Sequence, residues 1–142
     1  LKVVKRQKSK TALFYIDLDD FKKINDEYGH DAGDHVLKEV ANRLMAISRE
    51  TDTVTRLGGD EFAILFCYFD EIDFVHQIAR RLNESIAEPF IYHENEFDLG
   101  CSIGIAIAPD NIDNANDLII MSDKAMYISK NKGHNSYHIY SE

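Results

Sequence analysis

Apolar side chains recur along this chain at two spacings, one typical of strands and the other of helices. Residues 11–18 form a nearly unbroken run of aromatic and aliphatic side chains that ends in acid, as expected for a buried strand. A short helix is predicted over residues 21–28, and Gly29 is placed to end it in a left-handed conformation. The next apolar stripe has helical spacing and is made by Val36, Leu37, Val40, Ala41, Leu44 and Ile47.

Two acidic residues precede that stripe. Asp31 is placed to cap the predicted helix, with Asp34 in its first turn, where the helix macrodipole favours a carboxylate. Capping alone would account for both acids, and more readily for Asp31 than for Asp34. A structural role in stabilising the start of the helix is therefore an alternative to any functional role of Asp31 or Asp34.

The middle of the chain is predicted to form a hairpin. β-prone runs at residues 52–55 and 62–67 flank Gly58-Gly59, and paired glycines supply the positive φ angles that tight turns need. Glycines at 100 and 104 indicate that another element approaches a later strand closely. Beyond the hairpin the pattern predicts a helix over 70–88 stopped by Pro89, a weak strand over 90–93, a strand over 97–108, a helix from Asn114 or Asn116 to Gly133, and a strand over 136–140.

This order of elements indicates an α+β fold. We expect a central, mainly antiparallel sheet flanked by helices, in the palm-like or ferredoxin-like class. Residues 11–142 are predicted to form one domain, because no internal repeat or low-complexity tract interrupts the pattern. Residues 1–10 hold five bases and no acids and show no core face, so they are expected to be a linker or a remnant of a longer chain.

The charge of the chain restricts its partners. The formal net charge is −9, and since the first ten residues carry +5, the remainder carries −14. Such a body should repel a nucleic-acid backbone. It could bind a polyphosphate where divalent cations bridge the two sets of negative charge. These properties argue against a nucleic-acid-binding module and favour a metal–nucleotide site.

The cysteines and the apolar runs indicate a cytoplasmic location. Cys67 and Cys101 both fall within strand-like runs, which is typical of small core residues rather than of a disulfide or a metal pair. No apolar run approaches the length needed to cross a bilayer, and the chain opens with no signal-peptide pattern. We therefore expect no direct membrane insertion and a cytoplasmic domain, either by itself or as the cytoplasmic part of a larger membrane-attached sensor.

Acidic residues at two separate positions carry the candidate chemistry. Asp60 and Glu61 directly follow Gly58-Gly59 in the predicted hairpin turn, although solvation of an exposed turn accounts for these acids equally well. Asp17 ends the first predicted strand. If that strand pairs beside the hairpin, Asp17 and Asp60 converge on one edge of the sheet, where their oxygens suit Mg²⁺. Two such ions, about 3.5–4 Å apart, could polarise the attacking and leaving oxygens of a nucleotidyl transfer.

Four motifs occur in order along the chain from about Thr11 onward. They are Asp17 to Asp26 with Tyr28-Gly29-His30 and Gly33-Asp34, then Arg56 to Phe62, then Ser102 to Ala106, and finally Ser122 to Tyr127 with Lys130. These motifs resemble those of the GGDEF family, the diguanylate cyclase domains. An isolated Gly-Gly-Asp-Glu-Phe would be weak evidence, whereas four motifs in the family's order are strong evidence.

The resemblance implies condensation of two GTP molecules into cyclic di-GMP with release of two pyrophosphates. It implies that Mg²⁺ or Mn²⁺ is held by Asp17, the Leu18 carbonyl and Asp60. It implies that Asp60 or Glu61 helps to deprotonate the attacking 3′-hydroxyl. The implied GTP contacts are the backbone amides of Asp20 and Phe21, with Lys22 and Lys130, for the phosphates, Asn25 and Asp34 for the guanine, and Gly58 and Gly59 for close backbone approach.

The resemblance also implies partners beyond GTP. Each domain of this kind holds one GTP while the product contains two nucleotides, so a two-fold homodimer is expected. The Arg49-x-x-Asp52 stretch stands where many members carry a site that binds cyclic di-GMP as an inhibitor. Its structural alternative is that Arg49 complements a helix C-terminus and Asp52 opens a turn.

Two departures from the family pattern matter. This sequence starts after the helix that usually precedes the domain, so a fused sensor or EAL-type phosphodiesterase domain is expected in the full-length protein. His134 stands where the family often has Arg or Lys, and histidine is only partly charged near neutrality. We expect weakened GTP affinity, unless His134 is a solvated loop residue.

Two other functions compete with the cyclase. The main alternative is a non-catalytic, GTP-sensing regulatory domain coupled to an EAL-type phosphodiesterase; the ending Tyr137-His138-Ile139-Tyr140 resembles the join in such tandem proteins. The intact acids Asp17, Asp60 and Glu61 favour catalysis. A single-chain cyclase making cyclic GMP is disfavoured because it does not account for the GGDEF-specific motifs.

Overall fold

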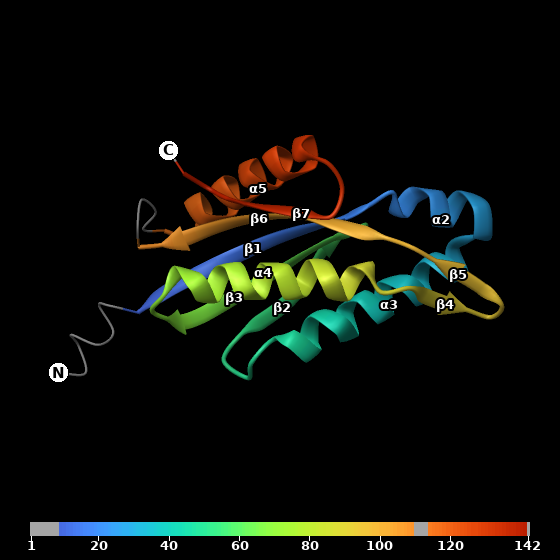
Figure 1. The fold of residues 1–142 in the computed structure, drawn as a ribbon, viewed down its shortest axis with the longest axis horizontal. Coiled ribbons are helices and arrows are strands. Elements are labelled where there is room, and N and C mark those ends of the chain that lie inside the picture. Colours follow the sequence, from blue (N-terminus) through green and yellow to red (C-terminus); the bar gives the residue numbers. More distant parts are fainter. Residues whose placement is uncertain (1–8, 110–113, 142) are drawn as a thin grey trace.

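The computed structural model describes residues 9–109 and 114–141, and its ribbon is shown in Figure 1. A five-stranded sheet forms the centre, in the order β2-β3-β1-β6-β7, and all neighbouring pairs are antiparallel except β6 and β7. The elements are β1 (Lys10–Asp19), α2 (Phe21–Tyr28), α3 (His30–Ile47), β2 (Thr53–Gly58), β3 (Glu61–Phe69), α4 (Ile72–Ala87), β4 (Phe90–Tyr92), β5 (Asn95–Phe97), β6 (Gly100–Ala108), α5 (Ala115–Lys132) and β7 (Ser136–Ile139). The predicted α+β class with a mainly antiparallel sheet is confirmed.

The two faces of the sheet are covered differently. On one face α3 and α4 pack over a large core that includes Phe14, Phe62 and Ile103, all almost completely buried. On the other face α5 lies across β1 and β6, on the opposite side of the sheet from α3 and α4 in Figure 1. Because side chains alternate along a strand, every second residue of β1 faces α5, and these residues include Asp17 and Asp19.

Small residues let α5 approach the sheet. A Cβ atom added to Gly104 of β6 would lie 2.0 Å from the Ser122 carbonyl oxygen and 2.1 Å from the Met126 nitrogen, so only glycine fits there. The predicted close approach at this glycine is confirmed. It brings the whole of α5, and Lys130 near its end, against the strand pair β1–β6.

The joint between α2 and α3 corrects one prediction. Gly29 has φ of 92° and serves both as the end of α2 and as the N-cap of α3, and no side chain caps α3. Asp31 is therefore not the cap but lies within the first turn, and Asp34 lies one turn further along. The prediction failed because Gly29, with its positive φ and extended ψ of 168° rather than the predicted left-handed helical conformation, joins the two helices without a linker. Helix α3 therefore starts earlier than a capping aspartate would require.

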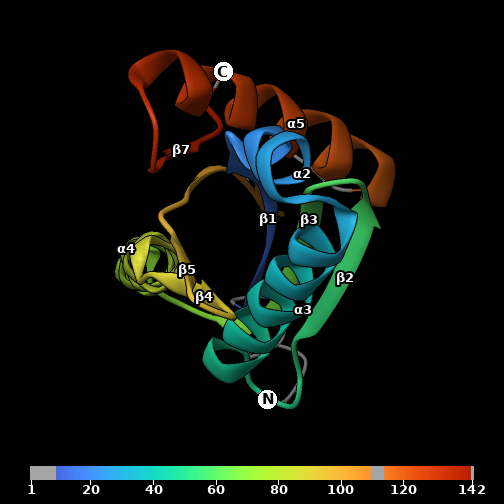
Figure 2. The same cartoon turned by 90° about the vertical axis from the view of Figure 1, so that its right-hand side faces the viewer.

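The strand boundaries after α4 also differ from the prediction. The weak strand near residue 90 is real, but it pairs with β5 in a separate two-stranded sheet, which lies between α3 and α4 in Figure 2. Phe97 belongs to β5, and β6 begins only at Gly100, so the predicted single strand over 97–108 is wrong at its start. The apolar residues of both strands gave one continuous pattern, in which the short break at residues 98–99 is not visible.

Asn114 rather than Asn116 caps α5, accepting a hydrogen bond from the Asp117 nitrogen.

Three further observations concern the cysteines, the N-terminal residues and the membrane. Cys101 is a buried core residue as expected, whereas Cys67 is only half-buried, and both are free thiols. Residues 1–8, which make up most of the predicted linker, lie outside the described part of the chain. Among the residues that the structure describes, no helix combines the length and apolar character needed to cross a membrane.

Candidate active site

Asp17 and Asp60 meet at the end of the sheet where β1 ends and the β2–β3 hairpin turns. Asp17 lies opposite Glu61 in the β1–β3 register, and the Leu18 nitrogen donates to the Asp60 carbonyl oxygen at 3.1 Å. Burial and the neighbouring Asp60 carboxyl raise the pKa of Asp17, although Lys130 opposes that shift. A carboxyl group such as Asp17, whose ionisation is disfavoured by burial and by a neighbouring carboxyl group, is a suitable place for a cation.

Lys130 reaches this acidic pair from α5. Its Nζ lies 2.9 Å from Asp17 Oδ2 and 3.9 Å from Asp19 Oδ1. Partial burial alone would lower the pKa of Lys130, but the hydrogen bond to Asp17 and the charges of Asp17, Asp19 and Asp60 raise it. The ammonium group is therefore held in its charged form beside the carboxylates.

The donor set fits a divalent cation such as Mg²⁺. Asp17 Oδ1 is buried and has no hydrogen-bond partner, which is unusual for a carboxylate oxygen. Among the described residues, no group of three or more His, Cys, Asp or Glu side chains could hold a metal by itself. Mg²⁺ is commonly bound by one or two carboxylates that are completed by water and substrate phosphates. Asp17, Asp60 and the backbone carbonyl of Leu18 are sufficient for a site of that kind.

Glu61 is held by the neighbouring strand. The Tyr15 hydroxyl donates to Glu61 Oε1 at 3.2 Å across the β1–β3 pair. Burial and the Glu61 charge raise the pKa of Tyr15 to about 12, so the phenol stays protonated and keeps donating. The Glu61 carboxylate therefore has a fixed direction next to Asp60.

The hairpin turn has the conformation that its glycines predicted. Gly58 has φ of 149° and Gly59 has φ of 48°, and a Cβ atom added to either glycine would meet nothing within 4 Å. Arg56 donates twice to the Gly59 carbonyl oxygen, at 3.0 and 2.8 Å. The turn is therefore braced by an arginine and open on its outer side.

The N-terminus of α2 lies across from the end of α5. Asp20 takes a left-handed conformation, with φ of 62°, and is followed by the buried Phe21 and the exposed Lys22. His134 stands between the two segments, with Nδ1 3.7 Å from Asp19 Oδ2 and Nε2 3.8 Å from Asp20 Oδ2. The start of α2 and the turn after α5 thus lie close to the acidic edge formed by Asp17, Asp19 and Asp20.

Asn25 and Asp34 lie on the two helices that Gly29 joins. The Asn25 side chain lies directly over Gly33, where an added Cβ atom would be 1.8 Å from Asn25 Oδ1. Asp34 is exposed and borders a cavity of about 450 Å³ between α3 and the β2–β3 pair. The other residues that line this cavity are Leu37, Lys38, Ala41, Met45, Val54, Thr55, Arg56 and Phe62.

Arg49 and Asp52 lie at the opposite end of β2 from the hairpin turn. Arg49 Nε lies 3.0 Å from Asp52 Oδ2, and the same guanidinium group also donates to the Cys67 carbonyl oxygen. Burial alone would raise the pKa of Asp52, but hydrogen bonds from Arg49 and from the Cys67 nitrogen lower it. This pair has a structural role in closing the α3–β2 turn, and its inhibitory role stays a prediction.

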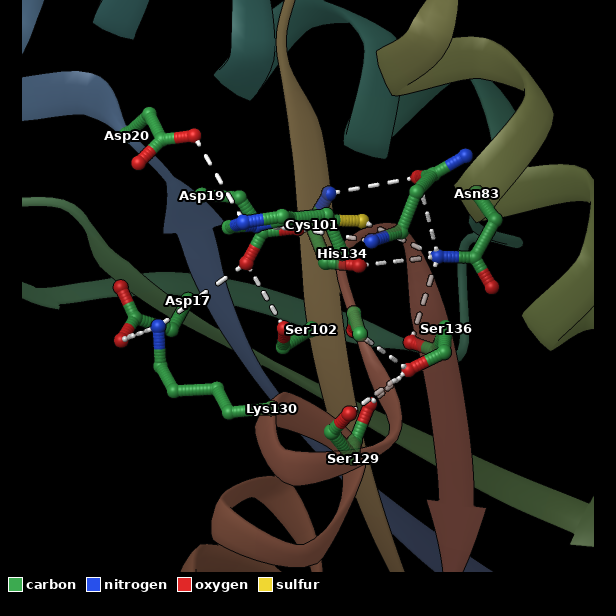
Figure 3. A network of polar contacts seen from close by, with 12 residues as sticks. Asp17, Asp19, Asp20, Asn83, Cys101, Ser102, Ser129, Lys130, His134 and Ser136 are labelled. Carbon is green, nitrogen blue, oxygen red and sulfur yellow. Dashed lines mark hydrogen bonds and ion pairs between the residues drawn. The ribbon is translucent and has the colours of Figure 1, made fainter.

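The site contains a polar network that the sequence motifs did not reveal. Asp19 accepts hydrogen bonds from Ser102 Oγ at 2.7 Å and from the Asn135 nitrogen at 2.8 Å. Figure 3 shows Asp19 beside Ser102, with Asp17, Lys130 and His134 nearby. Asn83 and Cys101 extend the network to α4 and β6. One signal in the sequence could have pointed to it, namely the alternation of β1, which places Asp19 on the same face as Asp17.

The family profile described as "Diguanylate cyclase, GGDEF domain" matches residues 1–136. The chain belongs to the GGDEF family. Relatives include the bifunctional diguanylate cyclase/cyclic di-GMP phosphodiesterase MucR of Pseudomonas aeruginosa, 40% identical over 93% of this chain, and diguanylate cyclase A of Treponema denticola, 35% identical over 91% of this chain. The chain spans only 19% of the first protein and 35% of the second.

Solved GGDEF domains have the same fold. The GGDEF domain of YfiN (or TpbB) from Pseudomonas aeruginosa superposes with a TM-score of 0.92 at 34% identity, covering 99% of this chain and 88% of that chain. The active GGEEF domain of a diguanylate cyclase from Vibrio cholerae gives a TM-score of 0.86 at 28% identity, covering 99% of this chain and 89% of that chain. The GGDEF motif itself, residues 58–62, is the β2–β3 turn and the start of β3.

Proposed function

We propose that this GGDEF domain condenses two GTP molecules into cyclic di-GMP, with release of two pyrophosphates. The observation that carries the proposal is the pairing of Asp17 and Asp60, with an unpartnered buried carboxylate oxygen and the Lys130 ammonium beside it. Relatives of this chain are named diguanylate cyclases, which supports the same activity.

Asp17, Asp60 and the Leu18 carbonyl would hold Mg²⁺ or Mn²⁺. When bound, the metal stabilises the charge that develops on the phosphate oxygens of the transition state. Lys130 and Lys22, with the amides at the start of α2, bind the β- and γ-phosphates and orient the α-phosphorus. These residues therefore supply position and charge, which is most of what phosphoryl transfer needs from a protein.

In the chemical step, the carboxylate of either Asp60 or Glu61 accepts the proton of the attacking hydroxyl group. The 3′-oxygen of one GTP bonds to the α-phosphorus of the other, and the bond from that phosphorus to the bridging oxygen breaks, releasing pyrophosphate. The carboxylate takes the 3′-hydroxyl proton as the new bond forms. Two such steps close the cyclic product. The Tyr15 hydrogen bond to Glu61 keeps one of these carboxylates oriented.

Selection of guanine is assigned to Asn25 and Asp34. A carboxylate at Asp34 accepts from both N–H donors on the guanine edge, whereas adenine would leave it without these partners. The cavity beside Asp34 has room for a base along α3. Gly58 and Gly59 leave open space at the hairpin, where the backbone can approach the nucleotide.

The product requires two copies of the site. Each domain would hold one GTP, so the active unit is a homodimer in which the two acidic edges face each other.

Cyclic di-GMP is proposed to inhibit by binding at Arg49 and Asp52. Product titration tests this second role: Arg49→Ala should bind cyclic di-GMP more weakly than the parent, and equal affinity would refute the inhibitory site.

We place the domain in the cytoplasm, in a longer protein with a sensor or EAL-type domain.

A GTP-sensing regulatory domain is the second candidate. It is favoured by the similarity to the cyclic di-GMP phosphodiesterase NbdA of Pseudomonas aeruginosa, 32% identical over 92% of this chain, and to the bifunctional MucR. In that function the site would bind GTP without turnover and transmit its occupancy to a fused phosphodiesterase domain.

One assay separates the candidates. Concentrated protein is incubated with GTP and Mg²⁺, and the products are identified by mass spectrometry, with Asp60→Asn as the inactive control. Cyclic di-GMP made by the parent alone supports the cyclase. Unchanged GTP together with measurable GTP binding supports the sensor, and cyclic GMP would contradict both.

A further inference from the structure

Asp19 is a buried carboxylate that holds several elements together without facing solvent. Its exposed fraction is 4%, and Ser102 Oγ donates to Oδ1 while the Asn135 nitrogen donates to Oδ2. Lys130 Nζ lies 3.9 Å from Oδ1, and His134 Nδ1 lies 3.7 Å from Oδ2. One side chain at the end of β1 therefore contacts β6, the end of α5 and the turn that follows α5.

The turn after α5 is held in an uncommon conformation. Gly133 has φ of 122° and Asn135 has φ of 58°, and a positive φ is uncommon for a residue with a side chain. Asn135 Oδ1 accepts from the Cys101 nitrogen and from Asn83 Nδ2, both at 3.3 Å. Together with the bond from the Asn135 nitrogen to Asp19, these contacts fix both the backbone and the side chain of Asn135.

Asp19 and Asp17 differ in what their oxygens can still bind. Both oxygens of Asp19 accept a hydrogen bond, whereas Oδ1 of Asp17 is buried without a partner. A Cβ atom added to Gly100 would lie 3.1 Å from Asp19 Oδ2, so the β6 backbone closes that side of the carboxylate. Asp17 therefore has an oxygen that can still bind a ligand, whereas both oxygens of Asp19 are already occupied by hydrogen bonds within the protein.

We propose that Asp19 is a positioning residue. Its ion pair with Lys130 and its hydrogen bonds from Ser102 and Asn135 hold Lys130 and the 133–135 turn at the edge of the sheet where the GTP phosphates are proposed to bind. The inference rests on the proposed GTP site and deepens it. Charge-assisted hydrogen bonds in a buried network are strong, and they keep neighbouring groups in one geometry. A group that binds phosphate must be placed before the ligand arrives, because ordering it afterwards costs affinity.

The sign of one mutational effect separates positioning from simple charge. Asp19→Asn removes a negative charge near the proposed phosphate site, and Coulomb's law alone predicts that a polyphosphate then binds more tightly. If Asp19 acts by positioning, the same substitution weakens binding, because a neutral amide makes weaker hydrogen bonds than the carboxylate and no longer attracts the Lys130 ammonium group. Positioning and simple charge thus predict opposite changes in affinity.

The test measures binding of 3′-deoxy-GTP with Mg²⁺, a nucleotide that lacks the attacking hydroxyl and cannot turn over. Asp19→Asn is expected to weaken this binding about tenfold, the effect of losing one charge-assisted hydrogen bond in the network. Its affinity for guanosine, followed by NMR titration, should equal that of the parent, because Asp19 acts only at the phosphate end. The matched control is Ser129→Ala, which removes a buried hydroxyl that contacts Ser136 rather than Asp19 and should leave 3′-deoxy-GTP affinity unchanged.

Each outcome decides the inference. Unchanged or tighter binding by folded Asp19→Asn overturns it, and so does an equal loss of guanosine affinity. If Asp19→Asn shows no cooperative thermal unfolding, Ser102→Ala replaces it: loss of this single donor should weaken 3′-deoxy-GTP binding about threefold, and an unchanged affinity overturns the inference. If the parent itself does not bind 3′-deoxy-GTP, the proposed function fails first.

Discussion

Lys130 Nζ lies 2.9 Å from Asp17 Oδ2, which joins the last turn of α5 to the end of β1. Each charge moves the titration of the other: Lys130 opposes the burial and the Asp60 charge that raise the pKa of Asp17, and Asp17 helps to raise the pKa of Lys130. The proposed metal ligand and the proposed phosphate-binding lysine therefore form one electrostatic unit, and a change at either residue should be felt by both.

Lys130→Met should change both the affinity for GTP and the pH dependence of activity. The variant loses a cation at the phosphates, and we expect the KM for GTP to rise about tenfold or more. It also removes the group that lowers the pKa of Asp17, so that pKa rises further. Activity should consequently be lost at a higher pH on acidification. A pH–rate profile checks this, with Lys124→Met on the exposed side of α5 as the control; identical profiles for parent and Lys130→Met would contradict the coupling.

His134→Arg should strengthen GTP binding. His134 lies between the carboxylates of Asp19 and Asp20 and is largely exposed, so a longer and permanently charged side chain has room to reach a terminal phosphate. Affinity for 3′-deoxy-GTP should rise about threefold to tenfold, as expected for a partly exposed charged contact. His93→Arg adds the same charge in the β4–β5 turn and serves as the control. An unchanged affinity would show that His134 is only a solvated loop residue.

Asp34→Asn should reduce the preference for guanine without destabilising the fold. Asp34 is exposed on α3, and no cap depends on it. The amide cannot accept from both guanine N–H donors, so we expect GTP affinity to fall about tenfold to a hundredfold while the weak affinity for ATP changes little. Competition binding measures both. Asp31→Asn removes the same charge from the preceding turn; if it lowers GTP affinity as much, general electrostatics rather than base recognition is responsible.

Asp52 should stabilise the protein at neutral pH but not in acid. Its side chain has an exposed fraction of 0%, and its pKa is lowered in the folded state, so its contribution is present above the ordinary carboxyl pKa and is lost as the pH falls through the lowered value. Asp52→Asn should therefore cost about 1–3 kcal/mol at pH 7, and this difference should shrink below about pH 4. Urea unfolding at both pH values checks this prediction. Glu50→Gln is the control from the same turn, and a cost that is independent of pH would contradict the account.

The pattern of the chain predicted the sheet and its helices because buried strands and amphipathic helices leave strong periodic signals. Gly104 could be recognised as a close-approach position because glycine weakens a strand interior unless a neighbour needs the space of the missing side chain. The start of α3 could not be located in the same way, since Gly29 ends one helix and begins the next. The break between β5 and β6 was hidden because apolar residues continue on both sides of it.

The site was predictable only where residue types are chemically distinctive. Asp17 stood out because it interrupts an apolar run, and Asp60 because it follows a pair of glycines in a predicted turn. The structure brings the two acids together. The sequence could not distinguish the role of Asp19 from that of Asp17 or Asp20, because all three are aspartates within four positions of one another. Its partners Ser102 and Asn135 lie far along the chain, and only the fold brings them to one carboxylate.

The most direct test of a divalent cation held by Asp17 and Asp60 beside GTP is Mn²⁺ binding in the presence of 3′-deoxy-GTP. Water-proton relaxation enhancement distinguishes the slowly tumbling protein complex from the free metal–nucleotide. The account predicts an enhanced signal for the parent and for Glu50→Gln, and at least about tenfold weaker Mn²⁺ binding for Asp17→Asn and for Asp60→Asn. Folded Asp17→Asn and Asp60→Asn variants that both bind Mn²⁺ and nucleotide as tightly as the parent would contradict it.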